Sequence, residues 1–234
     1  MKTKKTLIGI VLMFFLTIGL KFTSAFFSDA GQSQNNTFAA ADTFPTPTFV
    51  VTLTPSPSPT SLPVGPSDVI INEIMWMGSQ GNSADEWIEL RNMTSNTIDL
   101  SNWVIDNLGS GVNNNIVIPA GKSITPNGFF LISNDTEADS VISITPDHQT
   151  SSISLQNNGE QLILRTSAGG TILDIANGTG AWLAGDDNPE KSMERNSTPG
   201  DGAVGVSWHT ATSATNIDTD TDELATPRAA NSTP

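Results

Sequence analysis

Short apolar runs separated by polar breaks dominate the chain from residue 68 onward. The runs are rich in β-branched and aromatic residues and cover residues 69–77, 86–92, 98–107, 114–120, 128–133, 152–157, 160–166 and 171–176. Turn signals such as Asn127-Gly128 and Asn158-Gly159 separate them. Short β-branched runs at this spacing predict the strands of a sandwich or a barrel. No stretch keeps apolar residues at helical spacing for three turns, so little or no helix is expected.

The second run alternates with the period of a half-buried antiparallel strand. Ile88 and Leu90 fall on one face of the expected strand. Trp87, Glu89 and Arg91 fall on the other face, which we expect to be the solvated one.

The pattern weakens over residues 177–225, which are polar and rich in Gly, Asn and Asp. We expect long loops there, with Trp182 and Trp208 packing them onto the strands.

The first 25 residues have the pattern of a secretory signal peptide. A lysine-rich start precedes an apolar run over residues 7–20, and small residues follow up to Ala25. The run is shorter than the roughly 20 residues that a helix needs to cross a bilayer. We therefore expect cleavage and secretion, with an uncleaved membrane anchor as the alternative.

A small residue, two aromatics and a Ser-Asp pair follow the apolar run, and an Asn-Thr-Phe triplet comes later. The residues are Ala25, Phe26, Phe27, Ser28, Asp29, Asn36, Thr37 and Phe38. This segment resembles the start of bacterial proteins processed by the SipW-type signal peptidase. The resemblance implies cleavage after Ala25 and a secreted or cell-surface product. Some proteins of that group build extracellular fibres.

Residues 26–66 are expected to form a disordered linker or stalk. Seven of the 14 prolines lie in residues 45–66, mixed with Thr and Ser. Proline has no amide donor and a fixed φ, so neither a helix nor a central strand fits there. The folded domain is then expected over residues 67–231.

The motifs of this domain follow one another in a specific order. They are Ile71–Ile74, Glu86–Asn92, Asp99–Ile105, Ile118–Lys122, the Asn158-Gly159-Glu160 turn, Trp208-His209 and Thr226-Pro227. This order resembles the lamin tail domain family, in its bacterial exported branch. The resemblance implies an all-β, immunoglobulin-like β-sandwich with Trp103 in its core. It also implies a scaffold or interaction module without enzymatic activity.

The charge and the absence of cysteine exclude several kinds of function. The chain carries 10 basic and 24 acidic residues, a net charge of −14. Cleavage after Ala25 removes four lysines and no acid, which leaves 6 basic residues and a net charge of −18. A surface with this much negative charge repels phosphate backbones, and we therefore expect no nucleic-acid partner. The absence of cysteine excludes disulfides, thiol catalysis and zinc–thiolate sites.

Carboxylates gather near the first two runs. If these strands are neighbours, Glu73 and Glu89 could face each other or pair with Arg91, and a solvated edge or a Glu73–Arg91 pair is the favoured interpretation. The alternative is a calcium site built from Glu73, Asp85 and Glu89, because hard cations take several oxygen ligands. Calcium is the only cofactor for which the sequence offers candidates.

The acidic run over residues 218–223 does not fit an EF-hand. Glu223 stands where the sixth loop position requires Gly, and Ala229 stands where the twelfth requires Glu. A solvated acidic loop with weak calcium binding is the remaining interpretation.

No hydrolase, phosphate-binding or dinucleotide motif is present. His148 and His209 stand without the partner motifs of a catalytic site, so we predict no enzymatic activity and no catalytic residues. Among the tryptophans, Trp76 and Trp182 are the candidates for ligand contact.

The predicted function is a non-catalytic extracellular or cell-surface module that binds a protein or a polysaccharide. One alternative is a self-associating fibre subunit that adds residues 26–44 to the sheet edge of a neighbour. A second alternative is an accessory domain of an exported hydrolase or nuclease system. Contact with a membrane is expected only if the signal segment stays attached.

Overall fold

The structure is a computed structural model that describes residues 63–106, 115–219 and 221–234. The expected signal peptide, the segment 26–44 and nearly all of the expected linker lie outside these residues. In the described part, no helix is long and apolar enough to span a membrane. The helices found there are two short 3₁₀ turns, η1 (Glu137–Asp139) and η2 (Gly205–Ser207).

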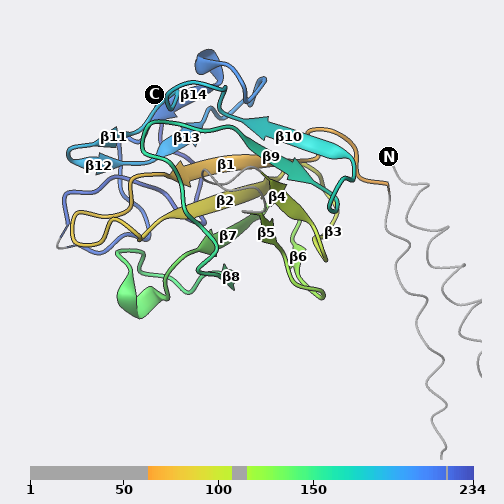
Figure 1. The fold of residues 1–234 in the computed structure, drawn as a ribbon, viewed down its shortest axis with the longest axis horizontal. Coiled ribbons are helices and arrows are strands. Elements are labelled where there is room, and N and C mark those ends of the chain that lie inside the picture. Colours follow the sequence, from red (N-terminus) through yellow and green to blue (C-terminus); the bar gives the residue numbers. More distant parts are fainter. Residues whose placement is uncertain (1–62, 107–114, 220) are drawn as a thin grey trace, which may run out of the picture. The chain divides into compact units, whose positions relative to one another are not determined.

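Two larger sheets form the fold (Figure 1). The first has the order β14 (Trp208–Thr210), β13 (Met193–Arg195), β1 (Val69–Met75), β2 (Trp87–Asn92), β7 (Phe129–Ser133) and β8 (His148–Gln149). The second has the order β10 (Ile172–Ala176), β9 (Leu162–Arg165), β4 (Val104–Asp106) and β5 (Ile116–Val117). Two small sheets pair β3 (Ile98–Asp99) with β6 (Ser123–Ile124) and β11 (Asp186–Asp187) with β12 (Glu190–Lys191). The expected all-β, immunoglobulin-like fold is confirmed.

Apolar side chains of both sheets form one core. Ile74 lies opposite Ile88 on β2 and opposite Met193 on β13, so the three share the inner face of the first sheet. Leu162 and Leu164 of β9 are fully buried in the same cluster, while the alternate residues Ile163 and Arg165 are only half buried. Trp103 is 4% exposed, which confirms its expected place in the core.

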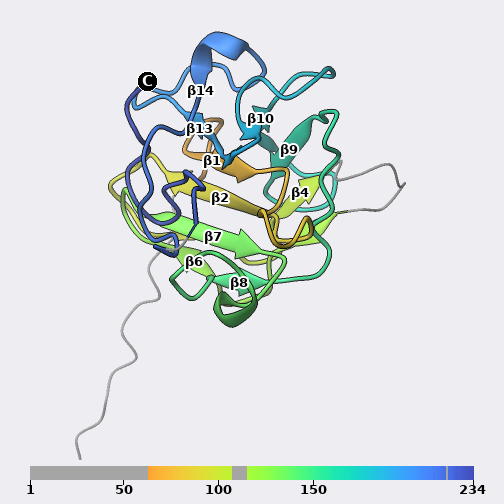
Figure 2. The same ribbon diagram turned by 90° about the vertical axis from the view of Figure 1, so that its left-hand side faces the viewer.

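Strands β1 and β2 in the middle of the first sheet are buried on both faces, so the expectation of a half-buried strand is wrong for β2. Trp87 and Glu89 are both 0% exposed. Residues 225–232, which we call the C-terminal strap, bind side chains on the outer face of this sheet. Figure 2 shows the dark-blue C-terminal segment on one side of β1 and β2, with β4 and β9 on the other side.

Three further local expectations need correction. Residues 177–225 are not only loops, because β13 and β14 extend the first sheet beyond β1. Residues 152–157 form no strand, although Ile153 and Leu155 are buried. The run over residues 98–107 is broken into β3 and β4 by a turn in which Asn102 has a φ of 64°. Asparagine tolerates this left-handed conformation better than most residues, because its short polar side chain can bond locally.

Candidate functional site

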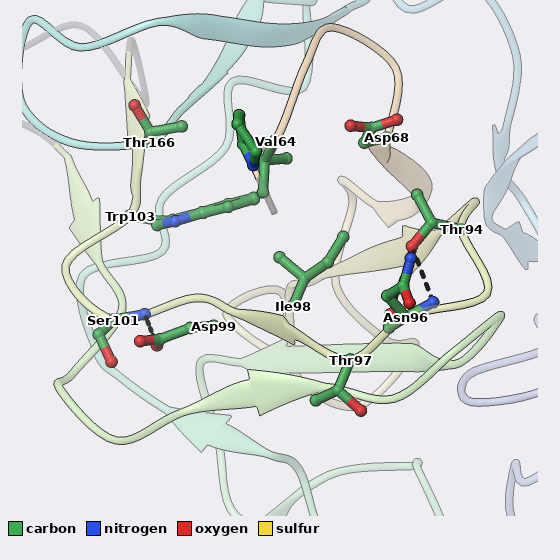
Figure 3. A pocket seen from close by; sticks show the side chains of 11 residues that line it. Val64, Asp68, Thr94, Asn96, Thr97, Ile98, Asp99, Ser101, Trp103 and Thr166 are labelled. Atoms are coloured by element: carbon green, nitrogen blue, oxygen red, sulfur yellow. Dashed lines mark hydrogen bonds between the residues drawn. The ribbon is translucent and has the colours of Figure 1, made fainter. Parts of the chain in front are cut away.

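The candidate site is a pocket of about 550 Å³ next to the first described residues (Figure 3). We call it the Asp99 pocket. Its lining consists of Pro63, Val64, Asp68, Thr94, Asn96, Thr97, Ile98, Asp99, Ser101, Trp103 and Thr166. Seven of the eleven residues belong to the loop after β2, to β3 and to the β3–β4 turn, so the strands of the sandwich position this wall of the pocket.

The buried amide of Asn92 organises the loop that forms one wall. Asn92 ends β2 and is 0% exposed. Its Nδ2 donates to the carbonyls of Asn96 (2.7 Å) and Thr125 (2.9 Å). Its Oδ1 accepts from the amide and the hydroxyl of Thr94, both at 2.9 Å. Thr94 and Asn96 are therefore fixed at the pocket wall by one side chain that does not line the pocket.

Replacing Asn92 by Ala should cost about 2–4 kcal/mol of the free energy of unfolding, because several buried polar groups lose their partner at once. Chemical denaturation followed by tryptophan fluorescence measures this change. Thr97→Ala is the control in the same loop, and we expect a loss of at most about 0.5 kcal/mol because Thr97 is exposed. Equal losses in the two variants would contradict the organising role of Asn92.

The opposite wall carries an ionised carboxylate. The hydroxyl and the backbone amide of Ser101 bond to Asp99 and lower its pKa. The amide bond, from Ser101 N to Asp99 Oδ1, is 2.8 Å long and is drawn in Figure 3. The Ser101 hydroxyl in turn accepts from the amide of Gly121 at 2.8 Å. The turn thus holds a charged acceptor at the pocket beside the indole of Trp103.

The lining combines apolar surface with groups that accept or donate hydrogen bonds. Hydroxyls and an amide come from Thr94, Asn96, Thr97, Ser101 and Thr166, and carboxylates from Asp68 and Asp99. No lysine, arginine or histidine is among the lining residues. This chemistry suits an uncharged ligand with several hydroxyl groups and disfavours an anion.

Glu73 and Glu89 lie opposite each other on β1 and β2, as the sequence suggested, but they are buried. Glu194 of β13 lies opposite Glu73 on its other side. Glu194, Glu73 and Glu89, which we call the glutamate row, are each 0% exposed beneath the C-terminal strap. The expected solvated edge is therefore wrong, and Arg91 instead stands over the ring of Phe129, 5.8 Å from its centroid.

Protein donors already occupy the glutamate row. Glu73 Oε1 accepts from the hydroxyl of Ser192 (2.6 Å) and from the amide of Thr226 (2.8 Å). Burial, together with the charge of Glu194, raises the pKa of Glu73 to about 8. Burial, together with Glu73, also raises the pKa of Glu89 well above its usual value. The raised pKa values of Glu73 and Glu89 favour their protonated forms at neutral pH, and protonated carboxyl groups are poor cation ligands.

Asp85, the third residue of the predicted calcium site, has different partners. It precedes β2, and its Oδ2 accepts from the amide of Val141 at 2.9 Å. Within residues 63–106, 115–219 and 221–234, no group of three or more Asp, Glu or His side chains is placed to hold a metal ion. Calcium binding by Glu73, Asp85 and Glu89 together thus has no geometric support and stays a prediction.

Trp76 and Trp182, the predicted ligand contacts, stack on each other. Their ring centroids are 5.9 Å apart with an interplanar angle of 10°. Trp76 is only 7% exposed, and its Nε1 donates to the carbonyl of Ala184. Gly185, with a φ of 93°, permits this contact, since a Cβ there would lie 2.4 Å from Trp76 Nε1. Each ring therefore covers a face of the other, and ligand contact through the half-buried Trp182 stays a prediction.

His209 joins a Ser-His-Glu cluster that lacks the geometry of a catalytic triad. Its Nε2 lies 3.0 Å from Glu194 Oε2 and 3.5 Å from the hydroxyl of Ser232. A triad needs the serine on one ring nitrogen and the acid on the other. Here both use Nε2, and the serine donates directly to the carboxylate. The cluster instead ties the C-terminal strap to β13 and β14.

Comparison with known proteins gives one family. Residues 64–179 match the Lamin Tail Domain family. No curated protein matches the chain. Among solved structures, the chain is similar to the crystal structure of a DUF4876 family protein from Bacteroides thetaiotaomicron VPI-5482, with 14% identity and a TM-score of 0.39 over 69% of this chain and 72% of that one. The family match runs from β1 to β10, so β11–β14 and the C-terminal strap lie beyond it. Together with the immunoglobulin-like sandwich, the match supports the lamin tail domain family as the family of residues 64–179.

Proposed function

We propose that this chain is an exported, non-catalytic binding module whose Asp99 pocket takes a segment of a neutral polysaccharide. The observation that carries the proposal is the lining itself. A pocket of about 550 Å³ falls in the size range of small-ligand sites. It presents hydroxyls, an amide and carboxylates, which pair with sugar hydroxyls, and none of its lining residues is cationic.

Charge and position support the same proposal. The net charge of −14 disfavours anionic glycans and nucleic acids. Signal-peptide features over residues 1–25 favour the outside of the cell, where polysaccharides are abundant, and the Pro-rich stalk would hold the module away from its point of attachment. Fibre formation through residues 26–44 and a role beside an exported hydrolase stay predictions that the described residues do not address.

Binding of neutral oligosaccharides should weaken about 10-fold or more when Asp99 is replaced by Asn. The substitution keeps an oxygen that can accept from the Ser101 amide but removes the charge that strengthens a bond to a ligand hydroxyl. Isothermal titration calorimetry on the full chain, after a screen of neutral glycans, measures the change.

Asp201→Asn is the matched control. Asp201 is an exposed aspartate that accepts from a backbone amide two residues ahead, as Asp99 does, but it lies outside the Asp99 pocket. Unchanged affinity in the control with a loss in Asp99→Asn would support the pocket. Binding that both variants retain in full would contradict it.

A further inference from the structure

A second pocket, of about 360 Å³, lies between three loops far apart in the sequence. We call it the Asp85–Glu223 pocket. It is lined by Ser79, Gln80, Gly81, Asn82, Asp85, Asp139, Ser140, Val141, Thr221 and Glu223. In Figure 1 the β1–β2 loop, the η1 region and the late C-terminal loops gather on the left of the first sheet. The pocket thus brings Asp85 together with Thr221 and Glu223 of the acidic run over residues 218–223.

Asp85 and Glu223 share an unusual arrangement. They are 1% and 2% exposed. One oxygen of each is held by a backbone amide, from Val141 N to Asp85 Oδ2 (2.9 Å) and from Gln80 N to Glu223 Oε1 (2.8 Å). The other oxygen of each, Asp85 Oδ1 and Glu223 Oε2, is buried and has no hydrogen-bond partner. Backbone amides therefore orient both carboxylates, and one oxygen of each carboxylate remains without a hydrogen bond.

Burying Asp85 and Glu223 in this way lowers the stability of the fold unless their free oxygens find a further partner. A buried carboxylate oxygen without a hydrogen bond loses its hydration and gains nothing in return. Within the described chain, no ion pair joins either residue to Lys, Arg or His. The site has an excess of negative charge that a cation would neutralise.

The rest of the lining supplies neutral oxygens of the kind that calcium accepts and a third carboxylate, that of Asp139. Calcium takes six to eight oxygen ligands in flexible geometry, from carboxylates, carbonyls and waters. Magnesium requires near-ideal octahedral geometry and keeps its water more firmly, so it suits this irregular pocket less well. The pocket offers side-chain oxygens of Ser79, Asn82, Ser140 and Thr221 beside the two carboxylates.

We propose that the Asp85–Glu223 pocket binds a calcium ion through the unpartnered oxygens of Asp85 and Glu223, with neutral oxygens of the three loops and water completing its coordination. Calcium there links the β1–β2 loop to the segment after η1 and to the acidic run near the C-terminus. The site is separate from the Asp99 pocket, so it stands or falls independently of polysaccharide binding.

The test is a calcium titration of the full chain by isothermal titration calorimetry, together with thermal unfolding in chelator and in 10 mM CaCl₂. A dissociation constant of about 0.1–1 mM, typical of extracellular calcium modules, is expected. Calcium at ten or more times that value should raise the Tm by several degrees. The same concentration of MgCl₂ should raise it much less.

Asp85→Asn and Glu223→Gln should each lower calcium affinity at least 10-fold, while Asp201→Asn leaves it unchanged. In chelator both pocket variants should have a Tm equal to or above that of the wild type, because each keeps its bond to the backbone and loses a buried charge. This measurement separates lost binding from lost folding. Absence of a calcium-dependent shift in the wild type, or the same shift in all three variants, would overturn the site.

Discussion

Replacing Asp174 by Ala should lower the free energy of unfolding by about 3–5 kcal/mol, the largest loss that we expect from a single substitution outside the apolar core. The change leaves the guanidinium of Arg195 buried without its counter-charge. Arg195 is 0% exposed, and its Nη2 is paired with Asp174 Oδ2. Urea denaturation at pH 7 measures the loss.

The rest of the Arg195 environment cannot replace a carboxylate. Its Nε and Nη1 donate to the carbonyls of Ile71 and Gly200, and the guanidinium lies 4.5 Å from the ring centroid of Trp208. Burial raises the pKa of Asp174, and Arg195 offsets only part of this rise. The ion pair joins β13 to β10, so it ties the first sheet to the second across the edge of the sandwich.

The Arg165–Asp106 pair is a matched comparison. It also joins an arginine to an aspartate of the second sheet, but the side chains are 21% and 22% exposed. Water can solvate Arg165 after the loss of its partner, so Asp106→Ala should cost about 1 kcal/mol or less. Similar losses for Asp174→Ala and Asp106→Ala would show that burial does not set the strength of these pairs.

Replacing Glu73 by Gln should make the domain more stable at pH 8 by about 3 kcal/mol and leave its stability at pH 5 nearly unchanged. The pKa of Glu73 is about 8 in the folded chain and about 4.5 in its ordinary state. The folded state therefore binds more protons than the unfolded state between these values. The stabilising contribution of the Glu73 carboxyl group is fully present below pH 4.5, and it is lost as the pH rises through 8.

Hydrogen-bond geometry supports a proton in the glutamate row. The hydroxyl of Thr226 lies 3.2 Å from Glu73 Oε2 and 2.7 Å from Glu194 Oε1. A hydroxyl donates only one hydrogen bond, so one of these two carboxyl groups must donate in return. Glutamine at position 73 supplies that donor permanently through its amide. It also keeps an oxygen for the Ser192 hydroxyl and the Thr226 amide.

The pH dependence of unfolding measures this effect. The wild type should lose several kcal/mol between pH 5 and pH 8, since Glu86, whose pKa burial raises to about 7, adds to the change in the same direction. The curve of Glu73→Gln should be flatter. Glu137→Gln, at an exposed carboxylate that accepts from the hydroxyl of Thr145, should leave the curve unaltered. A wild-type curve that rises toward pH 8 would contradict the buried protons.

The strands of the sandwich could be predicted from the sequence because their signals are local. Alternation identified β2 and β9, and β-branched runs identified β1, β7 and β10. Strand β13 was missed because its three residues, Met193, Glu194 and Arg195, include only one apolar side chain. It is a strand because β1 offers an unpaired edge and Arg195 finds a buried counter-charge. Neither cause is visible within the segment itself.

The sites were harder to predict for the same reason. A period of two shows that the faces of β2 differ, but it does not show that a polar strap will cover the second face. Asp85 was recognised as a candidate ligand, yet its neighbour Glu223 comes from the far end of the domain. Asn92 is the last residue of the motif Glu86–Asn92, and the motif alone does not indicate its role in the loop that follows. Its position at a strand end, before Thr94 and Asn96, was a local signal for an organised loop.

The C-terminal strap sets the order in which this domain can be completed. Synthesis from the N-terminus presents β1 and β2 before residues 225–232 arrive. Until then Glu73, Glu89 and Glu194, all fully buried in the finished domain, lack the hydrogen bonds that residues of the strap supply. Arrival of the strap therefore closes the outer face of β1, β2 and β13 over carboxyl groups that water solvates until then. Incomplete chains that still lack the strap expose sheet surface that favours association with one another.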